Sequence, residues 1–108
     1  MIEVRIYARA DGSRPFVDWL ESLRDSQARA RIKVRLARLE AGNLGDHKAI
    51  GDGLSELRID HGPGYRIYLA RRGVTLVVLF SGGDKRTQSA DIKRAKEYWV
   101  DWDQRGKP

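Results

Sequence analysis

Two short segments of alternating apolar and polar residues, joined by a tight turn, restrict the fold more than any other part of the chain. The apolar positions are Leu57 and Ile59 before the turn, and Tyr65, Ile67 and Leu69 after it. Direct neighbours on paired strands share a face of the sheet, so a common core must align Ile59 with Tyr65. This register predicts an antiparallel hairpin in which Arg58 lies opposite Arg66.

Two guanidinium groups that face each other across strands repel mildly, and this favours an anion between Arg58 and Arg66. Neutralisation by Glu56 and Asp60 is the alternative interpretation. His61, in the turn, has an intrinsic pKa of about 6.5, which suits general acid or base work near neutral pH, although it could equally be a plain turn residue. Lys85 follows a later strand and is expected at the same place. The expected catalytic residues are Arg58, His61, Arg66 and Lys85.

The N-terminal third predicts a strand and two helices. Residues 2–7 alternate, with Ile2, Val4 and Ile6 expected on the buried face and Glu3, Arg5 and Tyr7 on the other. A first amphipathic helix is expected to be capped by Ser13, to have Pro15 in its first turn and to bury Phe16, Trp19, Leu20 and Leu23. A second helix, capped by Asp25 or Ser26, has Ala28, Ile32, Leu36 and Leu39 on its apolar line.

The rest of the chain predicts a loop, three strands and a final helix. Residues 42–53 hold four glycines and are expected to form a long surface loop. Tyr68 is expected on the exposed face of its strand. The apolar run 74–80 indicates an interior strand, ending in a turn at 81–86, and a helix capped by Thr87 should follow, with Ile92, Ala95, Trp99 and Trp102 on one face. The element order β-α-α-β-β-β-α predicts one α+β domain over residues 1–108, an antiparallel sheet with helices packed against it.

The charge of the chain indicates an anionic partner. Its 21 Lys and Arg residues exceed its 15 Asp and Glu residues, for a formal net charge of +6. Arg31, Arg35 and Arg38 are expected to stack along one helix face, and either a nucleic acid or an acidic protein segment would neutralise them; a plain solvated face is the alternative. Lys48 and Arg86 complete the predicted nucleic-acid-binding set: Arg31, Arg35, Arg38, Lys48 and Arg86.

Several kinds of site and location receive no support from the sequence. With no cysteine and only two histidines, the chain predicts neither a disulfide nor a zinc site, and a mechanism without metal or cofactor is expected. The N-terminus lacks the pattern of a signal peptide, and no apolar run reaches the length of a membrane span. A cytoplasmic location without membrane contact is therefore expected.

Three motifs give the chain a family resemblance. They lie at 54–68, ending in Gly-Tyr-Arg-Ile-Tyr, at 82–88, which reads Gly-Gly-Asp-Lys-x-Thr-Gln, and at 91–99, which reads Asp-Ile-x-x-Ala-Lys-Glu-Tyr-Trp. With the order of elements, they resemble the RelE/ParE superfamily of type II toxin–antitoxin systems. The resemblance is to its phage-derived Gp49-like or HigB-like branch of addiction module killer proteins.

The resemblance implies a toxin that is neutralised by a cognate antitoxin, with a helix-turn-helix protein as the expected partner. RelE and HigB members cut mRNA on the ribosome without a metal, whereas ParE members poison DNA gyrase. The family's phosphate-holding arginine falls on Arg66, and its other basic positions fall on Arg58 and Lys85. Where RelE-type enzymes have a tyrosine as general base, this chain has Gln88.

The function expected from the sequence is that of a ribosome-dependent mRNA endoribonuclease in which a ribose 2′-hydroxyl attacks the adjacent phosphate. Arg58 and Arg66 would stabilise the phosphoryl charge, because a guanidinium can bind two phosphate oxygens. Lys85 would assist or protonate the leaving oxygen. The alternatives are a gyrase-inhibiting toxin and a nucleic-acid-binding module without catalysis.

Overall fold

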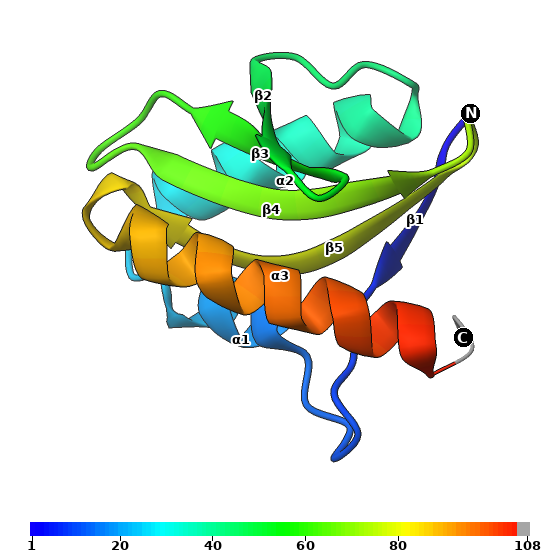
Figure 1. The fold of residues 1–108 in the computed structure, drawn as a ribbon. Coiled ribbons are helices and arrows are strands. Elements are labelled where there is room, and N and C mark those ends of the chain that lie inside the picture. Colours follow the sequence, from blue (N-terminus) through cyan, green and yellow to red (C-terminus); the bar gives the residue numbers. More distant parts are fainter. Residues whose placement is uncertain (106–108) are drawn as a thin grey trace.

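A five-stranded sheet forms the centre of the protein, as seen in a computed structural model that describes residues 1–105 (Figure 1). Along the chain, the elements are β1 (Glu3–Ile6), α1 (Pro15–Ser22), α2 (Ser26–Glu40), β2 (His47–Gly51), β3 (Leu54–Ile59), β4 (Tyr65–Arg72), β5 (Leu76–Asp84), a 3-10 turn (Lys85–Thr87) and α3 (Gln88–Gln104). The strand order is β1-β5-β4-β3-β2, and the fold is α+β.

The sheet is mixed, not wholly antiparallel as predicted. β1 pairs with β5 in parallel, while β2, β3, β4 and β5 pair in antiparallel fashion. The parallel pair arises because β1 lies at the edge beside β5, and the two helices that follow β1 carry the chain across one face before the remaining strands form. β5 is interior, as the apolar run predicted, and Val77 to Phe80 are buried.

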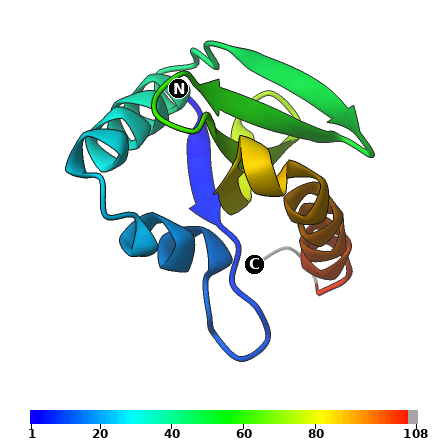
Figure 2. The ribbon, with the colours of Figure 1, turned by 90° about the vertical axis from the view of Figure 1, so that its left-hand side faces the viewer.

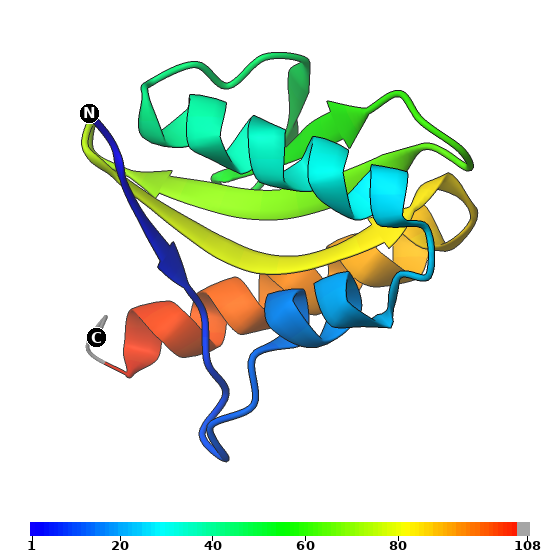
Figure 3. The ribbon, with the colours of Figure 1, turned by 180° about the vertical axis from the view of Figure 1, so that it is seen from behind.

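The helices cover both faces of the sheet. α1 and α2 lie on one face and α3 on the other (Figures 2 and 3). The first core contains Ile32, Leu57, Ile67 and Leu79 with their neighbours, and the second contains Tyr68, Phe80, Ala95 and Trp102. The apolar alternation of residues 57–69 therefore faces α1 and α2, as predicted. The intervening positions, which include both arginines, face α3.

The predicted loop at 42–53 was wrong in part, because it contains the edge strand β2. Gly51, Asp52 and Gly53 all have positive φ and form the turn between β2 and β3. Trp99 of α3 donates its Nε1–H to the carbonyl oxygen of Asp52 at 2.8 Å, and Lys96 Nζ lies 3.3 Å from Asp52 Oδ2. The glycines thus serve a hairpin turn that α3 holds in place, which a local pattern does not reveal.

The predicted turn at 81–86 begins later than expected, because β5 continues through Gly82 and Gly83 to Asp84. A Cβ on Gly82 would stand closer than 3.0 Å to the ring of Trp19, and one on Gly83 equally close to the carboxylate of Asp91. The two glycines therefore let α1 and α3 approach opposite faces of the same strand. Close approach of neighbouring groups, and not turn formation, explains the pair.

Three predictions about single side chains were wrong. Ser13 does not cap α1, since Pro15 is the first helical residue and the cap position falls on Arg14. Tyr7 is buried while Ile6 is 38% exposed, because β1 ends at Ile6 and the Tyr7 ring packs against Phe80 and Tyr98 in the core beneath α3. Tyr68, expected to be exposed, is fully buried in the same core.

The predicted cap of α2 was confirmed, whereas that of α3 was confirmed only in its position. Asp25 caps α2, as predicted, and accepts hydrogen bonds from the backbone N–H groups of Gln27 and Ala28. Thr87 occupies the cap position of α3, yet its hydroxyl donates to Asp91 Oδ2 at 2.5 Å and does not accept from the backbone.

Candidate anion-binding site

The hairpin β3–β4 carries the arginine pair in the predicted register. Arg58 lies opposite Arg66, Leu57 opposite Ile67 and Ile59 opposite Tyr65. Both arginines face the α3 side of the sheet near its end. The side chain of Arg66 is 14% exposed and that of Arg58 is 34% exposed. The side chain of Arg66 is thus largely withdrawn from solvent, whereas that of Arg58 remains about one third exposed.

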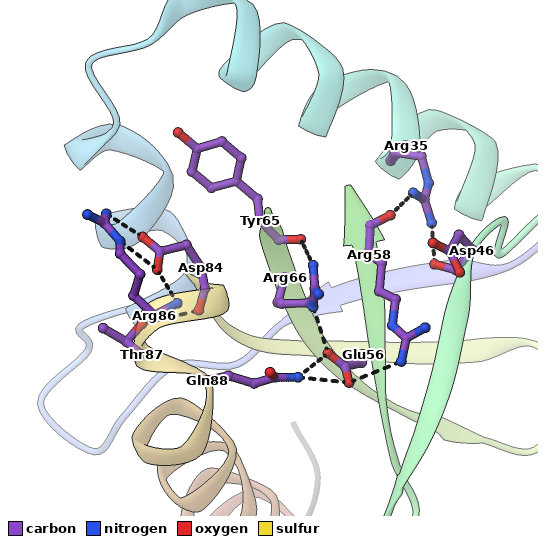
Figure 4. A network of polar contacts seen from close by, with 10 residues as sticks. All are labelled: Arg35, Asp46, Glu56, Arg58, Tyr65, Arg66, Asp84, Arg86, Thr87 and Gln88. Atoms are coloured by element: carbon purple, nitrogen blue, oxygen red, sulfur yellow. Dashed lines mark hydrogen bonds and ion pairs between the residues drawn. The ribbon is translucent and has the colours of Figure 1, made fainter. Parts of the chain in front are cut away.

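A buried carboxylate lies beside the two guanidinium groups (Figure 4). The side chain of Glu56 is 2% exposed, its Oε2 is 3.0 Å from Arg66 Nε, and its Oε1 is 3.9 Å from Arg58 Nη2. Gln88 Nε2 donates to both carboxylate oxygens, at 3.1 and 2.9 Å. Glu56 therefore neutralises part of the arginine charge, which is one half of the alternative that the sequence left open.

The outer edges of the arginines face a cleft of about 420 Å³. The cleft is lined by Asp46, Arg58, Asp60, Gly62, Pro63, Gly64, Arg66 and Lys85. A Cβ on Gly64 would lie 3.5 Å from Arg66 Nη1 and 3.7 Å from Lys85 Cβ, so a side chain at this position would meet both Arg66 and the base of the Lys85 side chain. The backbone N–H of Lys85 donates to Gly64 O at 2.9 Å and joins the hairpin turn to the end of β5.

The residues that line the cleft include three cations, Arg58, Arg66 and Lys85, and two aspartates, Asp46 and Asp60. Asp60, the other residue expected to balance the arginines, is exposed at the rim. The carbonyl oxygen of Asp46 accepts a hydrogen bond from the backbone N–H of Arg58. The three cations outnumber the two aspartates, so the lining suits an oxyanion such as phosphate, whose oxygens accept hydrogen bonds from guanidinium and ammonium groups.

His61 is directed away from this cleft and does not line it. Its Nε2 lies 2.9 Å from Asp25 Oδ2, and its ring stacks on Tyr65 at a centroid distance of 6.4 Å. The hydrogen bond to His61, with those from the backbone at Ala28 and Gln27, holds the pKa of Asp25 below its ordinary value. The prediction that His61 joins the arginines at one place is therefore not met by this geometry. The residue joins the hairpin turn to the start of α2.

We expect Asp25→Ala to lower the midpoint of thermal unfolding near neutral pH, because the variant loses the cap of α2 and the partner of His61. A carboxylate whose pKa is lower in the folded state stabilises the fold above its unfolded pKa of about 3.9, and this stabilisation is lost as the pH falls through the lower folded-state value. The difference from the wild type should therefore disappear in acid. Asp25→Asn, which keeps an acceptor for the cap, should lose less. A difference that stays constant down to acidic pH would contradict this assignment.

The predicted nucleic-acid-binding residues do not form one surface. Arg35 points inward, where its guanidinium donates to the carbonyl oxygens of Arg58, Leu44 and Asp46. Burial lowers the pKa of this guanidinium from its ordinary value. The hydrogen bonds of Arg35 therefore connect α2 to the following loop and to β3.

The other four predicted residues are exposed at different places. Arg31 and Arg38 line a second groove of about 390 Å³ between α2 and the end of β3, together with Arg35, Val34 and Asp60, so the three arginines share one face of α2, as predicted. Lys48 lies on the edge strand β2. Arg86 forms an ion pair with Asp84 at 2.8 Å, and the hydrogen bonds that it donates to this carboxylate raise the pKa of Arg86.

Sequence reasoning missed two residues of the site. The sequence marks Gln88 only as the residue that stands where RelE-type enzymes have a tyrosine, and its contact with Glu56 joins positions 32 residues apart. For Asp46 the sequence predicts only a place in a surface loop. Glu56 could be anticipated, because it is two residues from Arg58 on one strand and must share its face. Tyr68 shares this face as well, and burial, together with the nearby carboxylates of Asp91 and Glu56, raises its pKa above the ordinary value.

Comparisons with known proteins give one close relative. No family model matches the chain. A Haemophilus influenzae protein is 52% identical to it over 81 residues, which cover 75% of this chain and 82% of the relative. The chain belongs to the same family as this Haemophilus protein. The relative is named only as an uncharacterized protein, so the shared family brings no activity with it.

The described residues hold neither a cluster of metal ligands nor a helix that could span a membrane. Within residues 1–105, no group of three or more histidine, aspartate and glutamate side chains is arranged to hold a metal ion. None of the helices in that range combines the length and the apolar character that crossing a bilayer requires.

Proposed function

We propose that this chain is the toxin of a type II toxin–antitoxin system and that it cuts mRNA on the ribosome in the cytoplasm. The observation that carries the proposal is the convergence of Arg58, Arg66 and Lys85 on one cleft. These are the three positions on which the basic residues of the RelE/ParE superfamily fall by resemblance. The α+β class of the fold and the position of Arg58 opposite Arg66 in the β3–β4 hairpin support the proposal.

In the proposed reaction, the ribose 2′-oxygen attacks the adjacent phosphorus while the bond from phosphorus to the 5′-oxygen breaks. The products are a 2′,3′-cyclic phosphate and a free 5′-hydroxyl. Negative charge increases on the non-bridging oxygens, where Arg66 and Arg58 can each offer more than one N–H group. Donors already in place for such charge lower the barrier more than flexible ones. Lys85, on the other side of Gly64, donates a proton to the leaving 5′-oxygen.

The proton of the 2′-hydroxyl needs an acceptor. The carboxylates of Asp46 and Asp60 lie in the cleft lining and can take it. His61 can act as the base only by leaving Asp25 and turning toward the cleft. The proposal therefore assigns transition-state stabilisation to the two arginines and proton acceptance to a cleft carboxylate.

The test is to add purified protein to ribosomes programmed with mRNA and to map the ends of the fragments. Cleavage by the wild type, lost in Arg66→Ala, is the expected result. Intact mRNA together with inhibition of DNA supercoiling by gyrase would instead favour the gyrase-inhibiting class of toxin.

The groove beside α2 is proposed as the place where an acidic antitoxin segment binds. Its walls combine exposed Arg31 and Arg38 with the apolar side chains of Val34 and Ile59. Val34 is 49% exposed, so it offers an apolar contact beside the two arginines. A segment with acidic residues beside an apolar one would complement both features.

We expect the double variant Arg31→Glu, Arg38→Glu to bind the cognate antitoxin at least about a hundredfold more weakly, because like charges placed together across an interface cost several kcal/mol. Arg71→Glu, on the exposed end of β4, makes the same kind of change away from the groove and should bind normally. Calorimetry with the purified antitoxin measures both. Equal affinity of the double variant and the wild type would rule out the groove as the binding site.

A further inference from the structure

The contact between Glu56 and Arg66 leaves the outer edge of the arginine available. The carboxylate approaches Nε at 3.0 Å, but this N–H has no hydrogen-bond acceptor in line with it. On the other edge, Nη1 donates to Tyr65 O at 3.2 Å and lies beside Gly64, at the cleft. Glu56 thus acts on the interior side of the guanidinium, while the exterior side faces the cleft.

Glu56 also contacts Arg58, at a greater distance and likewise from the interior side. Arg58 Nη2 lies 3.9 Å from Glu56 Oε1, so the two groups form an ion pair but are too far apart for a hydrogen bond. A carboxylate between two guanidiniums that face each other across strands reduces their mutual repulsion. It therefore allows both cations to point to the same region without driving the side chains apart.

Gln88 connects this carboxylate to a third element of the fold. It is the first residue of α3, and its Nε2 donates to both oxygens of Glu56. Both carboxylate oxygens are therefore tied to α3 as well as to the arginines. The direction of the two guanidinium groups consequently depends on how the first turn of α3 is seated (Figure 4).

We propose that Glu56 and Gln88 are positioning residues that hold Arg66 and Arg58 in the orientation needed to bind an oxyanion in the cleft. The inference deepens the proposed function, on which it rests, because the oxyanion in that reaction is the scissile phosphate. Neither residue touches the anion. Glu56 acts through the arginines, and Gln88 acts through Glu56.

The effect of Glu56→Gln on phosphate affinity distinguishes a positioning role from a simple charge effect, because the two predict changes in opposite directions. Glu56→Gln removes a negative charge near the cleft, so Coulomb attraction alone predicts tighter binding of phosphate. Positioning predicts weaker binding, because the guanidinium groups lose their common partner and repel each other. Gln88→Ala leaves the net charge unchanged and should also weaken binding, which charge alone does not predict.

The test is a titration of the full chain with inorganic phosphate. NMR follows the Nε–H signals of Arg58 and Arg66 and gives the affinity. We expect both variants to bind about tenfold more weakly, the lower end of the loss seen when outer-layer partners of metal ligands are removed. The Arg66 signal should shift in each variant even without phosphate. Glu97→Gln and Gln104→Ala repeat the two changes at exposed positions of α3 and should match the wild type.

Phosphate binding by Glu56→Gln that is unchanged or tighter, or unchanged binding by Gln88→Ala, would overturn the positioning role and leave the proposed function intact. If the wild type and Arg66→Ala bound phosphate equally, the anion site itself would be wrong and both proposals would fail. Thermal unfolding shows whether each variant is folded. If Glu56→Gln does not fold, Gln88→Ala decides the question.

Discussion

Arg66→Ala is expected to reduce the rate of mRNA cleavage on programmed ribosomes by about a hundredfold to a thousandfold, the usual cost of removing one preorganised donor from a developing oxyanion. The side chain is only 14% exposed and is held by Glu56 on one edge and by Tyr65 O on the other. Its orientation is therefore set before substrate arrives. The measurement is single-turnover cleavage of a labelled mRNA.

Two further variants make this result specific. Arg66→Lys keeps the charge but cannot bind two oxygens at once, so its rate should lie between those of the wild type and Arg66→Ala. Arg71→Ala removes a positive charge from the exposed end of the same strand and should cleave normally. Equal loss in Arg66→Ala and Arg71→Ala would mean that general attraction of RNA, and not this site, determines the rate.

Gly82→Ala is expected to lower the free energy of unfolding by about 3 kcal/mol, at the upper end of what an overpacked core residue costs. The added Cβ would stand closer than 3.0 Å to the ring of Trp19, which is packed against Phe16 and Tyr65 and cannot withdraw freely. For a domain of this size, such a loss lowers the thermal midpoint by more than about 10 °C. Denaturant unfolding measures the free energy directly.

Comparison variants separate this clash from the general cost of replacing glycine. Gly73→Ala introduces a Cβ that meets nothing within 4 Å but forces a φ of +66°, so it should cost only about 1–2 kcal/mol. Adding Trp19→Leu to Gly82→Ala should cost less than the sum of the two single changes, since the smaller side chain makes room. Strict additivity would contradict the proposed clash.

The sequence predicted the elements whose pattern repeats locally. The periodicity of 26–40 and of 88–104 located the long helices, and the alternation at 57–69 set the correct register of the central hairpin. Prediction from local patterns failed where a contact between residues far apart in the sequence determines the structure. β2 depends on pairing with β3 and on the hydrogen bond from Trp99, and the extension of β5 through Gly82 depends on its pairing with β4.

The candidate site was predictable to a similar extent. Facing positions on paired strands placed Arg58 opposite Arg66, and the end of the next strand brought Lys85 to the same cleft. The orientation of His61 was not predictable, because it depends on Asp25, which lies 36 residues earlier and whose visible role was to cap a helix. The contact of Gln88 with Glu56 was hidden for the same reason.

The most direct test of the central claim is the chemical end left on mRNA after incubation with programmed ribosomes and the purified protein. If Arg58 and Arg66 stabilise the attack of a 2′-hydroxyl, the upstream fragment will carry a 2′,3′-cyclic phosphate and the downstream fragment a 5′-hydroxyl, and both will form at least about a hundredfold more slowly with Arg66→Ala. An upstream fragment that ends in a free 3′-hydroxyl, or mRNA that stays intact, would contradict the account.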